Sequence, residues 1–240
     1  MYYYDSVNIS ADDQTIATHP LIDACDGSII YRLLEHLGVP CAGKTVLDLG
    51  SGTGQVSRIL LGIPYLSVEA CDLDPQSFAY FETHPELKNV PFHILDVLED
   101  ELPKRYDAIV CRGVYHHFPK SKRANFLKRM SAYSNLLIVA DEGIREYENE
   151  KERVRNCETW YGYVIDEAKR RGITRLAEIE TDFLDHERLG TADDGLDFKE
   201  SPTHLVEDAF KVGLKPISVD RLGPWDEFGG GFYTATFALE

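Results

Sequence analysis

The sequence predicts an α/β protein built on a parallel β-sheet. Short apolar runs alternate with amphipathic stretches over much of the chain, which is the pattern of consecutive β-α units. The first apolar run is followed by Gly50, Gly52 and Gly54, and glycine permits the sharp turn from strand to helix that such a unit needs. After Asp141 the alternation gives way to helical periodicity, so we expect a helical insertion behind the fifth strand.

The elements follow from the local pattern. Strands are predicted at 45–49, 67–71, 90–95, 106–111 and 135–140. Helices are predicted between them at 54–61, 75–83 and 122–133, the last with Ser121 as its N-cap. A helix at 27–37 precedes the first strand, because its apolar residues form one stripe and Gly38 follows it.

The second half of the chain reads differently. Apolar residues recur at steps of three and four over 150–170, which predicts one amphipathic helix, and Leu176, Ile179 and Phe183 mark a second. A polar loop covers 191–199, and a later helix begins with Ser201 as N-cap and Pro202 in its first turn. Two strand-like runs, 216–222 and 232–239, finish the chain.

Composition bounds the function. The 240 residues carry 25 basic and 41 acidic side chains, a net charge of −16, which disfavours binding to a nucleic-acid polyanion. No apolar run is long enough to span a membrane, and the N-terminus lacks the basic and apolar parts of a secretory signal. The five cysteines form no C-x-x-C pair, so neither a disulfide framework nor a zinc site is indicated. We expect a cytoplasmic protein.

The glycine turn carries the most specific motif. Asp48, Leu49, Gly50, Ser51, Gly52, Thr53 and Gly54 read as an acid, one residue, and then Gly-x-Gly-x-Gly. This segment resembles motif I of the class I S-adenosylmethionine (SAM) methyltransferases, without departure. The resemblance implies a Rossmann-like, doubly wound sheet of seven strands whose last strand runs antiparallel. It also implies that Asp48, Gly50, Ser51, Gly52 and Gly54 bind SAM. It covers roughly 30–145 and 200–240.

Two further acids are expected at the ends of strands. Asp72 ends the second strand, roughly 20 residues past the glycine loop, where a carboxylate can accept from both ribose hydroxyls. It matches the acid of the family's V-D-L-S-P segment, and the resemblance places Leu73 beside the adenine. The alternative is that Asp72 or Asp74 caps the next helix. Asp96 and Val97 follow the third strand, where the family holds the adenine amino group and a ring nitrogen.

The expected reaction centre lies after the fourth strand. The run from Arg112 to Pro119 resembles the L-H-H-L-P ending of motif IV in small-molecule methyltransferases, and Arg112 would pass beside the methionine part of SAM. His116 and His117 are candidate catalytic bases, since an imidazole with a pKa near 6.5 accepts a proton at neutral pH. Adjacent side chains seldom aim at one point, so we expect one of the two to act.

Asp141 is the third candidate catalytic residue. At the end of the fifth strand, Asp141 or Glu142 could orient a histidine, hold a cationic amine or cap a helix. The N-terminal tyrosines, including Tyr4, either close over the methionine end of SAM, as in many relatives, or form a frayed terminus. Metal-dependent catechol-type relatives keep an acid near the end of the fourth strand where this chain has Arg112, so no metal is expected.

Together these features predict a single methyltransferase domain over 1–240, with cap helices at 1–40 and a lid at 145–200. SAM would donate a methyl group to a small-molecule acceptor and leave S-adenosylhomocysteine. Oxygen is the leading acceptor atom because a histidine base suits it, followed by nitrogen and carbon. Aromatic residues in the lid and last loop favour an apolar or aromatic acceptor. The alternatives are a SAM-binding protein without methyl transfer and an NAD-dependent oxidoreductase. The sequence is silent on oligomeric state.

Overall fold

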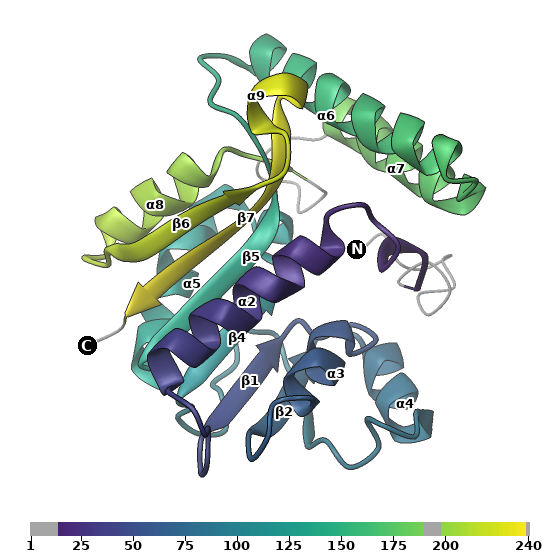
Figure 1. Ribbon diagram of the computed structural model, residues 1–240. Coiled ribbons are helices and arrows are strands. Elements are labelled where there is room, and N and C mark those ends of the chain that lie inside the picture. Colours follow the sequence, from purple (N-terminus) through teal and green to yellow (C-terminus); the bar gives the residue numbers. More distant parts are fainter. Residues whose placement is uncertain (1–13, 190–197, 239–240) are drawn as a thin grey trace.

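The computed structural model describes residues 14–189 and 198–238, so Tyr4 lies outside the described residues. The described chain forms one seven-stranded sheet with helices on both faces and a helical pair beyond one end (Figure 1). The strands are β1 (Thr45–Leu49), β2 (Ser67–Asp72), β3 (Phe92–Ile94), β4 (Ala108–Arg112), β5 (Leu136–Ile144), β6 (Pro216–Leu222) and β7 (Gly230–Ala238).

The strand order is β3-β2-β1-β4-β5-β7-β6. The first five strands are parallel to their neighbours, and β7 runs antiparallel between β5 and β6. Order and directions confirm the expected seven-stranded class I topology. Because β1 lies at the point where the chain order reverses, the loops after β1 and β4 diverge there, and open α/β sheets bind their ligands at such a point.

Helices cover both faces of the sheet. The elements α2 (Ile22–Leu37), α3 (Gln55–Leu61) and α4 (Pro75–Thr83) pack apolar side chains on one face. The other face is covered by α5 (Lys120–Tyr133) and α8 (Pro202–Lys211). Strands that are covered twice must be apolar on both sides, which explains why β1 and β4 consist mainly of apolar residues.

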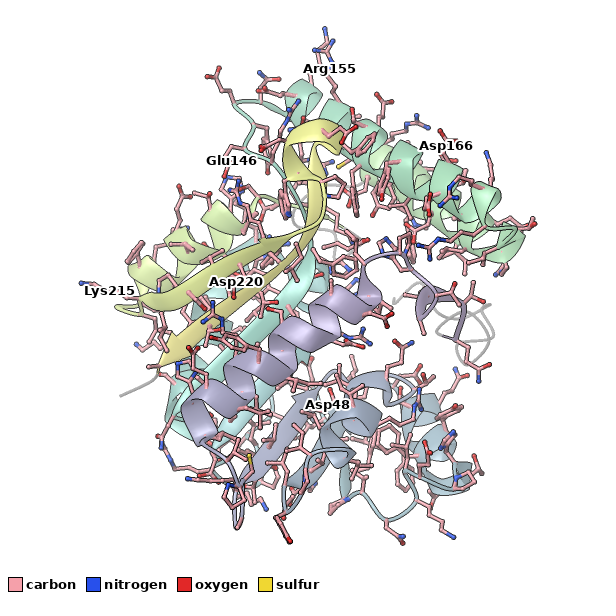
Figure 2. All side chains as sticks on the ribbon, in the orientation of Figure 1. Asp48, Glu146, Arg155, Asp166, Lys215 and Asp220 are labelled. Atoms are coloured by element: carbon pink, nitrogen blue, oxygen red, sulfur yellow. The ribbon has the colours of Figure 1, made fainter. Side chains whose placement is uncertain are left out.

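The inserted segment after β5 contains α6 (Glu150–Arg170) and α7 (Thr174–Leu189), which pack together at the end of β5 (Figure 1). Cys157, Trp160, Tyr161 and Val164 of α6 are fully buried in its core. Arg153 and Glu187 form a buried ion pair between the two helices, at 2.5 Å. The polar side of α6 faces outward, and Figure 2 shows Arg155 and Asp166 directed away from the sheet. A short helix, α9 (Trp225–Phe228), precedes β7.

Several of the expected boundaries of helices and strands are wrong. Ser121 lies inside α5, whose N-cap is Pro119, so the serine caps nothing. The third strand is shorter than 90–95, and β5 runs on to Ile144 because β7 pairs with it along its whole length. Helix α2 begins at Ile22, well before residue 27. Ser201 does cap α8, since its side chain accepts from the backbone N–H of Thr203.

Among the described residues, no helix combines the length and the apolar character needed to cross a bilayer. All five cysteines lie within the described ranges, and each is a buried free thiol.

Candidate functional site

The predicted site residues gather at the edge of the sheet where the parallel strands end. Leu49 of β1 is paired with Cys71 of β2, and Arg112 of β4 is paired with Ala140 of β5. Along that edge the order is therefore Asp72, the glycine loop, Arg112 and Asp141. This neighbourhood is a consequence of sheet order, since residues distant in sequence are brought together only by strand pairing.

The glycine loop requires its glycines. Gly50, Gly52 and Gly54 have φ values of 68°, 50° and 75°, in the region that other residues rarely adopt. A Cβ atom on Gly54 would lie 2.6 Å from the Leu87 side chain, so packing as well as φ excludes a larger residue.

Three backbone N–H groups of the glycine loop form hydrogen bonds within the protein. The N–H groups of Gly50 and Ser51 donate to the carbonyl of Cys71, and that of Gly52 donates to Asp72 at 2.8 Å. These three N–H groups bind the loop to the end of β2. The hydroxyl of Ser51 is different, because it is buried and has no hydrogen-bond partner among the described residues.

Asp48 is enclosed beneath this loop (Figure 2). It is 1% exposed and accepts a hydrogen bond of 2.6 Å from the Ser57 hydroxyl of α3. Burial raises the pKa of Asp48 to about 6, against the smaller opposing effect of the Ser57 hydrogen bond. This hydrogen bond ties the end of β1 to α3 beside the glycine loop.

The structure shows which of Asp72 and Asp74 caps α4, a point that the sequence left open. Asp74 caps α4, accepting from the N–H of Gln76, while Asp72 holds the glycine loop. The second oxygen of Asp72 accepts from the N–H of Asp74 at 2.9 Å. Burial raises the pKa of Asp72 despite these two hydrogen bonds. An ionised carboxylate has about four acceptor sites, so capacity remains for further donors.

The next part of the edge carries exposed apolar groups. Leu73, directly after β2, is 41% exposed, and Ile94, the last residue of β3, is 52% exposed. Asp96 is half-buried and accepts from the N–H of Leu98, and its own N–H donates to Asp100. Val97 is buried in the core beside this turn. Apolar groups of this kind, beside carboxylates, are suited to contact a flat ring with polar edges.

Arg112 reaches across the loop from the end of β4. Its guanidinium donates to Gln55 at 2.6 Å and to Asp26 of α2 at 3.2 Å. Burial raises the pKa of Asp26, while the charge of Arg112 opposes that shift. Arg112 thus fixes the start of α3 and the start of α2 at the same edge of the sheet.

His116 and Asp141 form a close pair. The sequence Tyr115–His117 makes a 3-10 turn, η2, and the Nδ1 atom of His116 lies 2.7 Å from Oδ1 of Asp141. The other oxygen of Asp141 accepts from the backbone N–H of His116 at 3.1 Å, and Oδ1 also accepts from the N–H of Glu142. Three N–H groups therefore converge on one buried carboxylate.

These contacts assign the protons. Burial acts to raise the pKa of Asp141, but His116, Lys199 and His117 together outweigh it and hold the pKa below its usual value. An ionised carboxylate only accepts, so Nδ1 of His116 must carry the hydrogen. In the neutral ring the lone pair is then on Nε2, the atom that can take a proton. Asp141 lies within β5, so it does not cap a helix.

His117 sits directly against His116. Their ring centroids are 3.9 Å apart at an interplanar angle of 47°. The two rings are therefore close and their planes are tilted against each other, and the expectation that only one of them acts stays a prediction.

Other residues at this site carried no recognisable signal in the sequence. His19 is 3% exposed and packs edge-on against Phe232, with centroids 4.9 Å apart. Burial lowers the pKa of His19 to about 3. Its Nε2 atom lies 3.4 Å from the Glu142 carboxylate, and Lys199 lies 3.6 Å from the same group. Only the folded chain places the N-terminal segment, β5 and residue 199 together, so a motif search could not find them.

The aromatic residues of the insertion and last loop are mainly core. Trp160, Tyr161, Trp225 and Phe232 are buried, and Tyr163 stacks on Phe228 at 4.3 Å. The Trp225 indole donates to the carbonyls of Leu222 and Phe232. Their packing explains their presence without an acceptor. No group of three or more His, Cys, Asp or Glu side chains within 14–189 and 198–238 is arranged to hold a metal ion.

Sequence comparison finds similarity to known proteins over part of the chain. Residues 46–134 match the family model of the methyltransferase domain. The malonyl-[acyl-carrier protein] O-methyltransferase of Acetivibrio thermocellus is 32% identical over 74 residues, which are 30% of this chain and 26% of that enzyme. The chain thus aligns with about a quarter of the length of that curated relative.

Structure comparison extends over nearly the whole chain. DhpI, solved with SAM and HEP, is 22% identical with a TM-score of 0.58, covering 95% of this chain and 91% of its own. The 1,6-didemethyltoxoflavin-N1-methyltransferase of Burkholderia thailandensis, solved with 1,6-didemethyltoxoflavin and S-adenosylhomocysteine, is 16% identical with a TM-score of 0.58. It covers 96% of this chain and 83% of its own. The protein therefore has the fold of the class I methyltransferases, and its residues 46–134 match the model of a methyltransferase domain.

Proposed function

We propose that this protein is a SAM-dependent methyltransferase that methylates an oxygen atom of a small molecule, with His116 as the base. The observation that carries the proposal is the His116–Asp141 pair, which lies at the same sheet edge as the glycine loop of the methyltransferase domain. A base is needed for an acceptor that still holds a proton, as a hydroxyl does. The malonyl-[acyl-carrier protein] relative is named as an O-methyltransferase, which also supports oxygen as the acceptor atom.

The residues at the edge fit an adenosyl group. Asp72 keeps acceptor capacity for ribose hydroxyls beyond its two backbone hydrogen bonds. Leu73 offers an exposed apolar surface for adenine, beside Asp96 and Val97 for the polar edge of the base. The buried Ser51 hydroxyl, unpartnered among the residues described, is a further polar group available to the ligand. Arg112 supplies positive charge on the side where the methionine carboxylate would lie.

When bound, SAM supplies an electrophilic methyl group on a sulfonium. The contribution of the protein is to hold the acceptor close and dry, and to manage one proton. Nε2 of His116 takes the hydroxyl proton, and the imidazolium that results is stabilised by Asp141 at 2.7 Å. Asp141 also fixes the ring orientation, because it binds both the ring and the backbone N–H of the same residue. We assign no chemical step to His117.

The inserted segment 145–200 would cover the acceptor, as a lid. Its position supports this role, since it leaves the sheet at the end of β5, directly after Asp141 and Glu142 (Figure 1). The buried aromatics of α6 are accounted for by packing, so they do not narrow the acceptor to an aromatic molecule. The acceptor proposed is a small molecule with an ionisable hydroxyl.

The proposal is tested in two steps with purified, ligand-stripped protein. Calorimetry with SAM and S-adenosylhomocysteine measures cofactor binding, and absence of binding would refute the proposal at once. A panel of phenols, carboxylic acids and amines is then incubated with SAM, and S-adenosylhomocysteine is quantified. Turnover of hydroxyl compounds supports O-methylation, and turnover of amines alone would replace oxygen by nitrogen. SAM binding without turnover of any extract or panel compound would favour a binding protein.

A further inference from the structure

Arg123 is an arginine buried inside a helix–sheet interface, and its contacts are unusual. Its side chain is 1% exposed, although it lies on α5, whose other basic residues face solvent. The guanidinium donates to the carbonyl of Phe118 at 2.8 Å and to that of His116 at 3.2 Å. It also lies over the ring of Tyr115, 5.2 Å from the centroid. Arg123 therefore contacts three of the four residues from 115 to 118.

The turn needs this support. Within η2 the N–H groups of His117 and Phe118 are bonded to the carbonyls of Val114 and Tyr115. The carbonyl of His116 is bound by Arg123. Asp141 binds the backbone N–H and the ring of the same residue. His116 is thus held by a carboxylate on β5 and by a guanidinium on α5.

Glu200 binds the guanidinium of Arg123 and holds it in place. Its carboxylate is bonded to Arg123 and also accepts from Lys120 at 3.0 Å and from the Tyr147 hydroxyl at 3.2 Å. Burial acts to raise the pKa of Glu200, but the charges of Arg123 and Lys120 hold it below its usual value. An ionised Glu200 and a planar guanidinium with several fixed donors make a rigid unit, which lysine could not reproduce.

The same carboxylate joins the two ends of the inserted segment. Tyr147 precedes α6, and Glu200 is the last residue of the inserted segment and precedes α8. The backbone carbonyl of Glu200 also accepts from the N–H of Ile144, the last residue of β5, at 3.2 Å. Entry and exit of the insertion therefore meet at the residue that holds Arg123.

We propose that Arg123, seated by Glu200, is a positioning residue that holds His116 in the orientation required of the base and ties that orientation to the ends of the inserted segment. The proposal rests on the proposed function, because it concerns the same base. It assigns Arg123 no contact with cofactor or acceptor. Its effect passes through two carbonyl groups of the turn and through the ring of Tyr115.

The test uses a signal of His116 that does not require turnover. In histidine-labelled protein, the Nδ1–H group of His116 is assigned by its loss in His116→Gln and is followed by nitrogen–proton NMR. Arg123→Lys keeps the positive charge but loses the planar guanidinium with its several N–H donors. Glu200→Gln keeps the shape of the side chain but removes its negative charge. We expect both variants to shift or abolish this signal while the other histidine signals stay in place. Lys128→Ala, an exposed change on the same helix, should leave it untouched.

Activity supplies the second readout, with the acceptor identified by the panel above. We expect kcat to fall by about tenfold to a hundredfold in Arg123→Lys, with the Kd for SAM within about twofold of wild type. Adding Glu200→Gln to Arg123→Lys should lower kcat little further, because the two residues act as one unit.

The outcomes separate the two ideas. A folded Arg123→Lys or Glu200→Gln variant with an unchanged His116 signal would overturn the positioning role. Loss of folding in both variants would assign the pair to stability alone and would overturn it too. If no acceptor is found, the proposed function fails, but the NMR result still decides whether Arg123 positions His116.

Discussion

Replacing Asp72 tests the cofactor site most directly. Alanine at this position removes the acceptor proposed for two ribose hydroxyls, and it also releases the N–H of Gly52 in the glycine loop. Hydrogen bonds to a charged group contribute about 1.5–3 kcal/mol each, but the released groups regain water, so we expect a net loss of about 1–3 kcal/mol. The Kd for SAM should then rise by about 5- to 150-fold.

A graded pair of variants separates ribose binding from loop support. Asp72→Asn retains one acceptor oxygen without the charge, so its loss of affinity should lie between wild type and Asp72→Ala. Asp74→Ala is the matched control, because it removes the cap of α4 two residues away and leaves Asp72 in place. Loss of an N-cap costs about 0.5–2 kcal/mol of stability, and the affinity for SAM should stay near wild type.

Isothermal calorimetry with SAM and with S-adenosylhomocysteine measures all three variants, and thermal unfolding reports their stability. Adenosine gives a further check, since it contains the ribose but lacks the methionine. If Asp72→Ala binds SAM as tightly as wild type while remaining folded, the ribose assignment is wrong. Equal losses for Asp74→Ala and Asp72→Ala would mean that the shape of the α4 entry, and not the carboxylate, determines binding.

Three other predictions concern the base, the buried acid and the loop. Asp141→Asn should lower kcat by about 10- to 150-fold without changing SAM affinity, because the amide no longer fixes the proton on Nδ1 of His116; turnover at the wild-type rate contradicts the assigned base. Burial raises the pKa of Asp48 to about 6 from 3.8, so its protonated form favours the folded state. Stability from this group is complete below about pH 3.8 and is lost by about pH 6, amounting to about 2–3 kcal/mol. Urea titrations from pH 4 to 7 should show that Asp48→Asn lacks this decline; parallel curves would mean that Asp48 does not titrate in this range. Gly54→Ala should cost about 1–3 kcal/mol of unfolding free energy, since φ is 75° and neighbouring side chains fill the space, whereas Gly27→Ala, inside α2 with nothing within 4 Å, should be neutral or stabilising; equal effects would refute the strain argument.

Local chemistry determined much of this protein from the sequence. The helices Pro75–Thr83 and Glu150–Arg170 lie where they were expected, because Asp74 and Pro75 mark the start of the first and the spacing of apolar side chains specifies the second. The acid and glycines of the first loop indicated the fold class, since few turns need that backbone. Where the limits were set by pairing with another strand, as for β3 and the end of β5, the sequence failed.

Tertiary structure decided how the site is assembled. The sequence nominated His116 and Asp141 separately, but only the pairing of β4 with β5 brings their side chains to 2.7 Å and fixes the proton on one ring nitrogen. Capping of α4 by Asp72 was an alternative that the sequence left open, and the structure assigns the cap to Asp74. The sequence did not indicate Arg123, Glu200 and His19 as functional candidates, because burial of a charged or polar side chain cannot be inferred from one sequence. The fold makes their burial possible by supplying each with a partner from a distant segment.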